Sequence, residues 1–240
     1  MRSVDVTAVV TFHREGLIAH RSLTSILRSC KHAETQGITT RIVATLDNAD
    51  SETRRVVTQH PGLRSDDVVA DLSFSDVAAS RNYAIQIGES RYISIFDGDD
   101  QVSANWLEAA LHRLDEMVEP SIIHPQMVIT FDVATQFREQ PDQSIVEFDR
   151  KNLLVTNFWN VCSFASKDVF LSHPYESAVQ AGFGFEDWHW NCETVAAGYK
   201  HLTAPRTVYF ERRKQYGSLN NAHQLAGAVI LPSRLFGRLE

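Results

Sequence analysis

Short apolar runs alternate with longer stretches of helical spacing through the first half of the chain. The runs are rich in β-branched residues and cover residues 5–12, 40–46, 67–72 and 91–96. The helical stretches cover residues 15–36, a short helix from Ser51, residues 76–87 and residues 104–117. This alternation predicts βαβ units, so we expect an α/β fold with a mostly parallel central sheet and helices on both faces.

The second half of the chain is less regular. Residues 121–131 and 144–148 are expected to be strands, residues 158–164 are rich in aromatic side chains, and residues 207–210 form a last short strand. A segment with two glycines leads into a helix expected over residues 186–197, which Gly198 ends. No repeat or linker separates the halves. We therefore expect a single domain over residues 1–240, with both halves sharing one sheet.

Polar residues cluster where three of the predicted strands end. These clusters are His13-Arg14, Asp47-Asn48 and the segment from Asp97 to Asp100. Ligands of open α/β sheets bind beyond the carboxyl ends of the parallel strands. The strand pattern therefore places these three groups around one crevice.

Composition limits the classes of function. The chain has 240 residues and a net charge of −7, and its longest basic cluster is Arg212-Arg213-Lys214, so we expect no nucleic-acid partner. Three widely spaced cysteines predict reduced, buried thiols rather than disulfides. The sequence has no signal-like N-terminus and no apolar stretch of about 20 residues, which a membrane span would need. We therefore expect a cytoplasmic protein. Peripheral association with the inner face of the membrane is compatible with this expectation. The chain is also compatible with being part of a longer protein with further domains.

Three carboxylates, on Asp97, Asp99 and Asp100, directly follow an apolar strand. Like charges packed so closely are costly unless a cation neutralises them. Carboxylate oxygens suit Mg²⁺ or Mn²⁺, which also bind phosphate oxygens. Two alternatives are a solvated turn and a calcium loop of the EF-hand type. The calcium loop is disfavoured, because Val102 stands where it needs glycine and a strand stands where it needs a helix.

The surrounding sequence makes this segment more specific. Ser80-Arg81-Asn82, an apolar strand, Asp97-Gly98-Asp99-Asp100 and Asn105-Trp106-Leu107 follow one another in an order that resembles the donor-binding core of family 2 glycosyltransferases. The resemblance covers most of the chain. It implies a GT-A fold, which is a Rossmann-like fold. It also implies a nucleotide-diphosphate sugar as donor, inversion at the transferred sugar, and Mn²⁺ or Mg²⁺ as cofactor. Residues 1–118 would bind the donor and residues 119–240 the acceptor.

The resemblance also implies roles for single residues. Donor contacts are expected at Phe12, His13, Asp47, Arg81, Asp97 and Asp100. Asp99 is expected to bind the metal, and Asp97 to contact the metal through water or the ribose. Asp100 would lie near the sugar or orient the loop, and Arg81 would lie near the diphosphate or be a surface arginine. Asp47 would contact the base, although Asn48-Ala49-Asp50 here replaces the usual Asp-Gly-Ser continuation.

A second motif lies at residues 182–188. Gly-Phe-Gly-Phe-Glu-Asp-Trp resembles the Gly-Phe-x-x-Glu-Asp acceptor motif of the family. Inverting transfer needs a base that takes the proton of the acceptor hydroxyl. We expect Asp187 to be this base, and Glu186 and Trp188 to contact the acceptor. The alternatives are helix capping for the two acids and core packing for the tryptophan.

The last informative segment covers residues 209–219, which resemble the closing Tyr-x-x-Arg-x-x-x-Gly-Ser segment of the family. Relatives often carry a metal-binding histidine there, and Lys214 or a neighbour stands at that position in this chain. We expect Arg213 and Lys214 to contact the diphosphate, and a solvated basic turn is the alternative.

The function expected from the resemblance is therefore sugar transfer to a glycan or lipid-linked acceptor, in cell-surface polysaccharide synthesis. Two other functions stay open at this point. One is a metal-dependent nucleotidyltransferase, although no glycine-rich phosphate loop follows Phe12. The other is a non-catalytic nucleotide-sugar or glycan-binding domain, although both acidic motifs are present.

Overall fold

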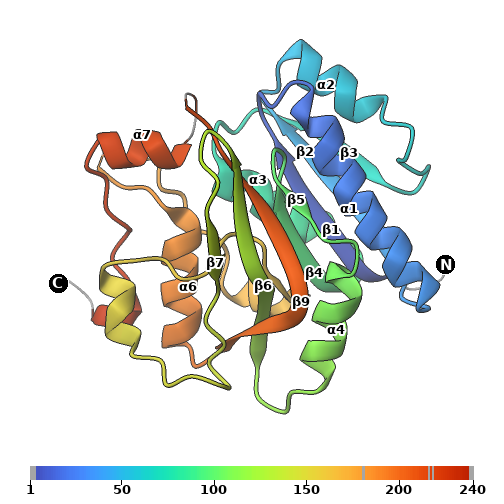
Figure 1. The fold of residues 1–240 in the computed structure, drawn as a ribbon. Helices are drawn as coiled ribbons and strands as arrows, with labels where there is room; N and C mark the ends of the chain where they lie inside the picture. The colour runs from blue at the N-terminus through green and yellow to red at the C-terminus, as the bar shows by residue number, and fades with distance from the viewer. Residues whose placement is uncertain (1–3, 180–181, 216, 218, 238–240) are drawn as a thin grey trace.

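The computed structural model describes residues 4–179, 182–215, 217 and 219–237. Tyr216 and Ser218 of the closing segment lie outside these residues. In the described chain nine strands form one sheet in the order β3-β2-β1-β4-β8-β6-β9-β5, with β7 paired to β6 (Figure 1). The strands are β1 Val4–Phe12, β2 Thr40–Asp47, β3 Val68–Leu72, β4 Ser90–Asp97, β5 Gln101–Val102, β6 Ser121–Asp132, β7 Phe137–Glu139, β8 Phe164–Ser166 and β9 Lys200–Arg213.

The first four strands form the parallel half of the sheet, as expected. β1 lies between β2 and β4, with Val10 aligned to Ala44 on one side and to Phe96 on the other. Seven consecutive residues of β1 are buried, which is why this strand reads as one continuous apolar run. All three of these neighbouring strands end at the same edge, where the polar clusters begin.

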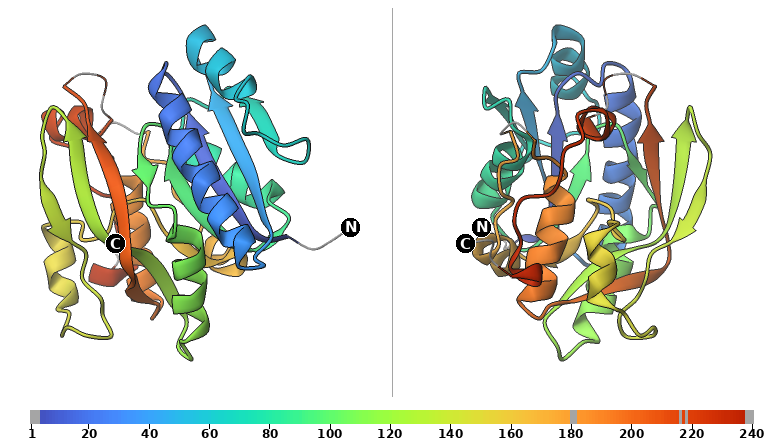
Figure 2. Two further views of the ribbon diagram at one scale, coloured as in Figure 1. Left: turned by 45° about the vertical axis from the view of Figure 1, so that its right-hand side comes forward. Right: turned by 90° about the vertical axis from the view of Figure 1, so that its left-hand side faces the viewer.

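Helices cover both faces of the sheet, also as expected. They are α1 Ile18–Thr35, α2 Ser51–Thr58, α3 Val77–Ile87, α4 Trp106–Asp115, α5 Lys167–Ser172, α6 Glu186–Ala196 and α7 Leu219–Leu225, with 3₁₀ turns η1 Arg150–Leu154 and η2 Arg234–Phe236. Figure 2 shows α1 and α4 on one face and α3 on the other. Two apolar clusters fill these layers, one around Leu23 and Trp106 and the other around Ile93 and Trp190.

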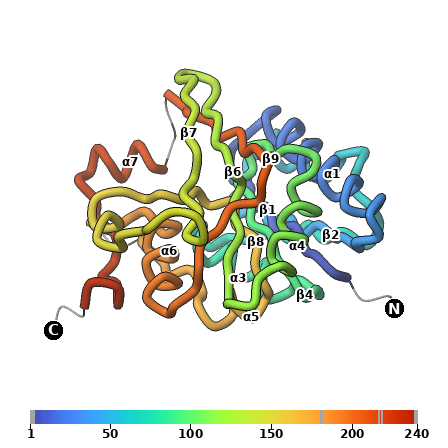
Figure 3. The backbone as a smooth tube through the Cα atoms, turned by 60° about the horizontal axis from the view of Figure 1, so that its bottom comes forward, coloured from blue at the N-terminus to red at the C-terminus, as the bar shows by residue number. Residues whose placement is uncertain are grey.

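The second half of the chain extends the same sheet (Figure 3). β6 and β9 pair in parallel from Ser121 and Lys200 to Asp132 and Arg213, with an irregularity between Pro125 and Met127. β8 joins them to β4 by antiparallel pairing. The last strand is therefore much longer than the expected residues 207–210.

The strand expected over residues 144–148 is wrong. Asp142 accepts hydrogen bonds from the Ser144 N–H and hydroxyl, at 2.8 and 2.5 Å, and from the Thr203 N–H, at 2.9 Å. The carboxylate folds this segment into a turn against β9, and that tertiary contact overrides the alternating pattern.

Two further observations concern the chain as a whole. The three cysteines, Cys30, Cys162 and Cys192, are free and buried. No helix in the described residues is long and apolar enough to cross a membrane.

Candidate active site

The acidic turn lies against the end of β1. Asp97 ends β4, and the chain turns through Gly98 to reach β5 at Gln101. A Cβ atom on Gly98 would lie 2.3 Å from Cδ1 of Phe12 and 2.6 Å from the carbonyl oxygen of Thr11. Only glycine fits this close backbone approach, which holds the carboxylates on either side of it at the edge of the sheet.

A buried arginine joins the two acidic motifs. The Arg81 guanidinium donates to Asp97 Oδ1 and to Glu186 Oε1, each at 2.7 Å, although these carboxylates are 89 positions apart in sequence. Its side chain is 2% exposed and lies over the Tyr175 ring, at 5.3 Å from the centroid. Burial disfavours the charge, but the two carboxylates outweigh it and raise the arginine pKa. Arg81 is therefore not a surface residue, which corrects that alternative, and its expected place near the donor stays a prediction.

Asp99 is bound by a lysine of the closing segment. Lys214 Nζ lies 2.7 Å from Asp99 Oδ2. The carboxylate of Glu15 adds to the field around this pair, and burial raises the pKa of both Asp99 and Glu15. Burial opposes the lysine charge, but Asp99 and Glu15 outweigh it and raise the pKa of Lys214.

The carboxylates present do not form a ready metal site. Asp97 is bound to Arg81 and Asp99 to Lys214. In the described part of the chain, no group of three His, Cys, Asp or Glu side chains is arranged to hold a metal ion. The expected Mn²⁺ or Mg²⁺ therefore stays a prediction, since each ion pair uses one oxygen of its carboxylate, Oδ1 of Asp97 and Oδ2 of Asp99.

Asp100 orients the turn, the second of its two expected roles. Its Oδ1 accepts a hydrogen bond from the backbone N–H of Arg212 at 2.6 Å. Burial, followed by the charges of Asp99 and Asp97, raises its pKa well above the usual range. A side chain so enclosed ties the acidic turn to β9 and does not contact a donor without rearrangement.

The acceptor motif begins helix α6. Phe185 precedes the helix with a left-handed backbone, φ 57° and ψ 55°, and its N–H donates to His223 Nδ1 at 3.2 Å. Asp187 lies in the first turn, where Asn157 Nδ2 donates to its Oδ2 at 3.1 Å. Burial, with the neighbouring Glu186 charge, raises the pKa of Asp187 to about 7. A carboxyl group of this pKa can exchange a proton near neutral pH.

Asp47 holds a loop in place. Its carboxylate accepts the backbone N–H groups of residues 74–76, at 2.7 to 3.0 Å, and the Ser80 hydroxyl at 2.9 Å. These hydrogen bonds outweigh burial and lower its pKa. Contact with a nucleotide base stays a prediction for Asp47, whereas its loop-holding role is visible.

The remaining expected contacts fall into two groups. His13 is exposed at the end of β1, and Arg213 is 37% exposed, with Nη2 at 2.9 Å from Glu211 Oε1. Both side chains are therefore accessible to a ligand. Phe12, in contrast, is 1% exposed and packs in the core, and its expected donor contact stays a prediction. Trp188 packs in a cluster with Leu153 and donates to its carbonyl oxygen at 2.9 Å, which favours the core-packing alternative.

Two residues of the site were not expected from the sequence. Glu15 directly follows the polar pair His13-Arg14 at the end of β1. Its place at the end of a parallel strand is the sequence signal that could have marked it as a residue of the site. Asn157 lies in an irregular segment, and Asn191 Nδ2 fixes its side chain by donating to Asn157 Oδ1 at 2.9 Å. No sequence pattern marks that residue.

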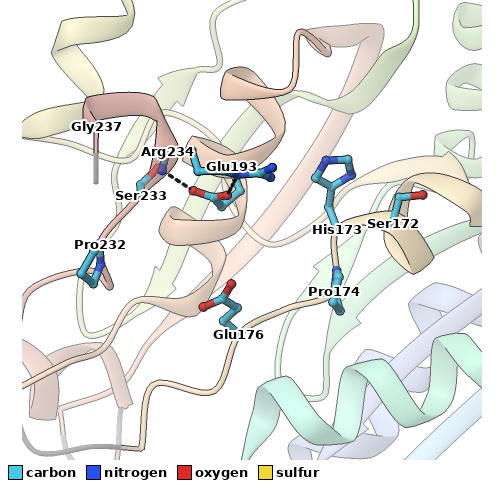
Figure 4. A pocket seen from close by; sticks show the side chains of 9 residues that line it. All are labelled: Ser172, His173, Pro174, Glu176, Glu193, Pro232, Ser233, Arg234 and Gly237. Atoms are coloured by element: carbon cyan, nitrogen blue, oxygen red, sulfur yellow. Dashed lines mark hydrogen bonds and ion pairs between the residues drawn. The ribbon is translucent and has the colours of Figure 1, made fainter. Parts of the chain in front are cut away.

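A pocket of about 450 Å³ lies elsewhere (Figure 4). It is enclosed by α5, α6 and the segment near η2, and Glu193 there binds the backbone N–H and side chain of Arg234. It contains none of the expected site residues.

One comparison with known proteins identifies the family of this chain, and another identifies its fold. The model of the family described as "Glycosyl transferase family 2" matches residues 7–172. Residues 1–349 of S. aureus TarS in complex with UDP-GlcNAc match with a TM-score of 0.69 and 12% identity, over 90% of this chain and 61% of that chain. The same fragment in complex with UDP gives a TM-score of 0.62 at 14% identity, over 88% and 61% of the two chains.

A longer S. aureus TarS structure matches with a TM-score of 0.61 and 13% identity, over 88% of this chain and 37% of that chain. The present chain thus spans only part of the length of the structures it resembles. No curated protein matches it.

Proposed function

The chain belongs to glycosyl transferase family 2, and from this premise we propose that it moves a sugar from a nucleotide-diphosphate sugar to an acceptor hydroxyl, with inversion at the anomeric carbon. It is a glycosyltransferase with the GT-A fold of the matching structures. The UDP-GlcNAc complex of a structural neighbour supports a nucleotide-sugar donor.

The observation that carries this proposal is the meeting of the two acidic motifs at Arg81. Its guanidinium holds Asp97 of the donor side and Glu186 of the acceptor side at 2.7 Å each. Asp187 follows directly, so its carboxylate lies in the electrostatic field of Asp97. A donor bound at the ends of β1, β2 and β4 and an acceptor bound at α6 would thus meet beside Asp187.

In the proposed reaction, Asp187 takes the proton of the acceptor hydroxyl. The hydroxyl oxygen forms a bond to the anomeric carbon on the face opposite the diphosphate, and the bond between that carbon and the diphosphate oxygen breaks. The electron pair leaves with the nucleoside diphosphate, and the proton stays on Asp187 until water removes it. The Asn157 side chain donates to one carboxylate oxygen, Oδ2, and this hydrogen bond orients the carboxylate.

The finer assignments are proposals of the same kind. Mn²⁺ or Mg²⁺ at Asp97 and Asp99 is the sequence-based proposal for how the charge of the departing diphosphate is neutralised, and a cation of the chain itself at Asp99 is the alternative. The acceptor would be a glycan or a lipid-linked sugar, in the synthesis of a cell-surface polysaccharide at the inner face of the membrane. His13 and Arg213 are accessible candidates for donor contacts.

Donor hydrolysis tests the proposed function. The chain is incubated with UDP-, GDP- and dTDP-sugars, with and without Mn²⁺, and release of nucleoside diphosphate is measured. We expect the chain to release nucleoside diphosphate from the sugars of one of these nucleotides, at a rate above that of heat-denatured protein. A chain that neither binds nor hydrolyses any of these donors would instead fit the non-catalytic alternative or another function.

A further inference from the structure

Lys214 binds Asp99, the carboxylate that is expected to bind the metal. β9 pairs with β5, with Phe210 aligned to Gln101, and the Arg212 N–H donates to Asp100. This pairing carries the end of β9 directly over the acidic turn. The lysine two residues later therefore reaches Asp99, with Nζ at 2.7 Å from Oδ2.

The surroundings of this lysine resemble those of a bound cation. The carboxylates of Asp99 and Glu15 both stabilise its charge, and together they raise its pKa. Arg212 is a second positive group in the field of Asp99. Asp97 and Asp99 therefore each have a cation of the chain itself as partner, whereas a cluster of unpaired carboxylates would need an external one.

The lysine also retains capacity for a ligand. An ammonium group has three N–H donors, and Asp99 accepts one of them. The side chain is 26% exposed, so the remaining donors can reach the crevice. Two phosphate oxygens of a diphosphate can accept them, as charge-assisted hydrogen bonds of the stronger kind.

We propose that Lys214, held by Asp99, replaces the divalent metal in binding the donor diphosphate, so that this chain binds nucleoside diphosphates without a metal ion. The inference rests on the proposed function, because it specifies how that site holds its donor. It differs from the sequence-based expectation, in which Asp97 and Asp99 bind Mn²⁺ or Mg²⁺. Arg81 supplies a second cation of the chain at the expected metal ligands, since it binds Oδ1 of Asp97.

The test is a calorimetric titration with UDP, GDP and dTDP, in EDTA and in excess Mn²⁺. Wild-type protein is expected to bind one of them in EDTA, with little gain from Mn²⁺. Lys214→Ala should weaken binding in EDTA by about 10- to 100-fold, the factor for one charge-assisted hydrogen bond. Mn²⁺ should then restore binding, because Asp99 is free to accept it. Lys214→Arg, which keeps the charge, should bind in EDTA more tightly than Lys214→Ala.

Lys200→Ala is the matched control, since this lysine is exposed at the opposite end of the same strand. It should bind as the wild type does. Wild-type binding that is lost in EDTA and restored by Mn²⁺ would overturn the inference and leave the glycosyltransferase proposal intact. Absence of binding for every nucleotide in both conditions would overturn both.

Discussion

Arg81 keeps its charge inside the molecule, between carboxylates from the two halves of the chain. Its bonds to Asp97 and Glu186 satisfy both partners, and the Tyr175 ring covers the guanidinium. A buried ion pair adds little net stability compared with apolar packing, but removal of one partner leaves uncompensated charge. The arginine is therefore a positioning residue, which fixes the distance between the donor and acceptor motifs.

Replacement of this arginine by a neutral residue should be costly. Arg81→Gln leaves Asp97 and Glu186 close together without a cation, and we expect a loss of about 3 to 5 kcal/mol in the free energy of unfolding. Urea denaturation measures it. Arg55→Gln, at an exposed position of α2, is the control and should change stability by less than about 0.5 kcal/mol. A loss for Arg81→Gln as small as that of the control would contradict the bridging role.

At the scale of elements, the turn from β4 to β5 depends on Gly98. The space for a Cβ atom is taken by the Phe12 ring and by a backbone oxygen of β1, and the oxygen cannot move aside as a flexible side chain could. Because the carboxylates of Asp97 and Asp99 flank this glycine, any shift of the turn moves both.

Gly98→Ala should therefore reduce stability and donor binding together. We expect a loss of about 1 to 3 kcal/mol, as for overpacked cores, measured by thermal unfolding with and without a nucleoside diphosphate. Gly88→Ala is the control, because its Cβ would meet the nearest atom, a methyl carbon of Thr7, at 3.2 Å. If the two variants behave alike, the close approach at Gly98 does not constrain the turn.

Elements with strong local patterns could be predicted from the sequence, and elements set by tertiary contacts could not. The four parallel strands and α1, α3, α4 and α6 were found within a few residues, because burial on both faces gives continuous apolar runs and helices show their spacing. The turn at residues 144–148 was missed, since Asp142 stabilises it from outside the pattern. The acidic residues of the site could be predicted from the sequence, but their ion-pair partners could not. Arg81 and Lys214 are distant in sequence from the acids that they bind, so these pairs form only in the folded chain.

At the scale of the whole molecule, a pair of buried histidines lies between the sheet and α6. His124 Nε2 and His201 Nδ1 are 2.9 Å apart, and Thr194 Oγ1 lies 2.9 Å from His201 Nε2. Burial lowers the pKa of His124 to about 3 and that of His201 well below its usual range. Both rings are therefore neutral in the folded chain, and they join β6, β9 and α6 behind the acceptor motif.

This pair makes folding pH-dependent. In the unfolded chain each ring binds a proton near its ordinary pKa of about 6.5, whereas the folded chain keeps both neutral. The unfolded state thus binds more protons at these two rings below about pH 6.5, so this pair lowers the free energy of unfolding as the pH drops. Asp187 acts in the opposite direction over the same range, because its pKa is raised in the folded chain. His124 alone should cost about 2 kcal/mol at about pH 5.

Urea denaturation between about pH 5 and pH 7 measures this dependence. His201→Gln removes one of the two buried rings and should make the slope of stability against pH shallower. His112→Gln, whose side chain is 60% exposed in the wild type, should leave the slope unchanged. An unchanged slope in His201→Gln would show that other groups cause the pH dependence.

We propose that the two halves of one sheet bring a donor and an acceptor together at Asp187. The most direct measurement compares sugar transfer and donor binding in wild type, Asp187→Asn and the control Asp168→Asn, an exposed acid in the first turn of α5. We predict that Asp187→Asn binds donor as the wild type does but transfers sugar about 10²- to 10⁴-fold more slowly. The wild-type rate should rise as the pH increases through about 7, as Asp187 ionises. Transfer by Asp187→Asn at the wild-type rate would contradict the account.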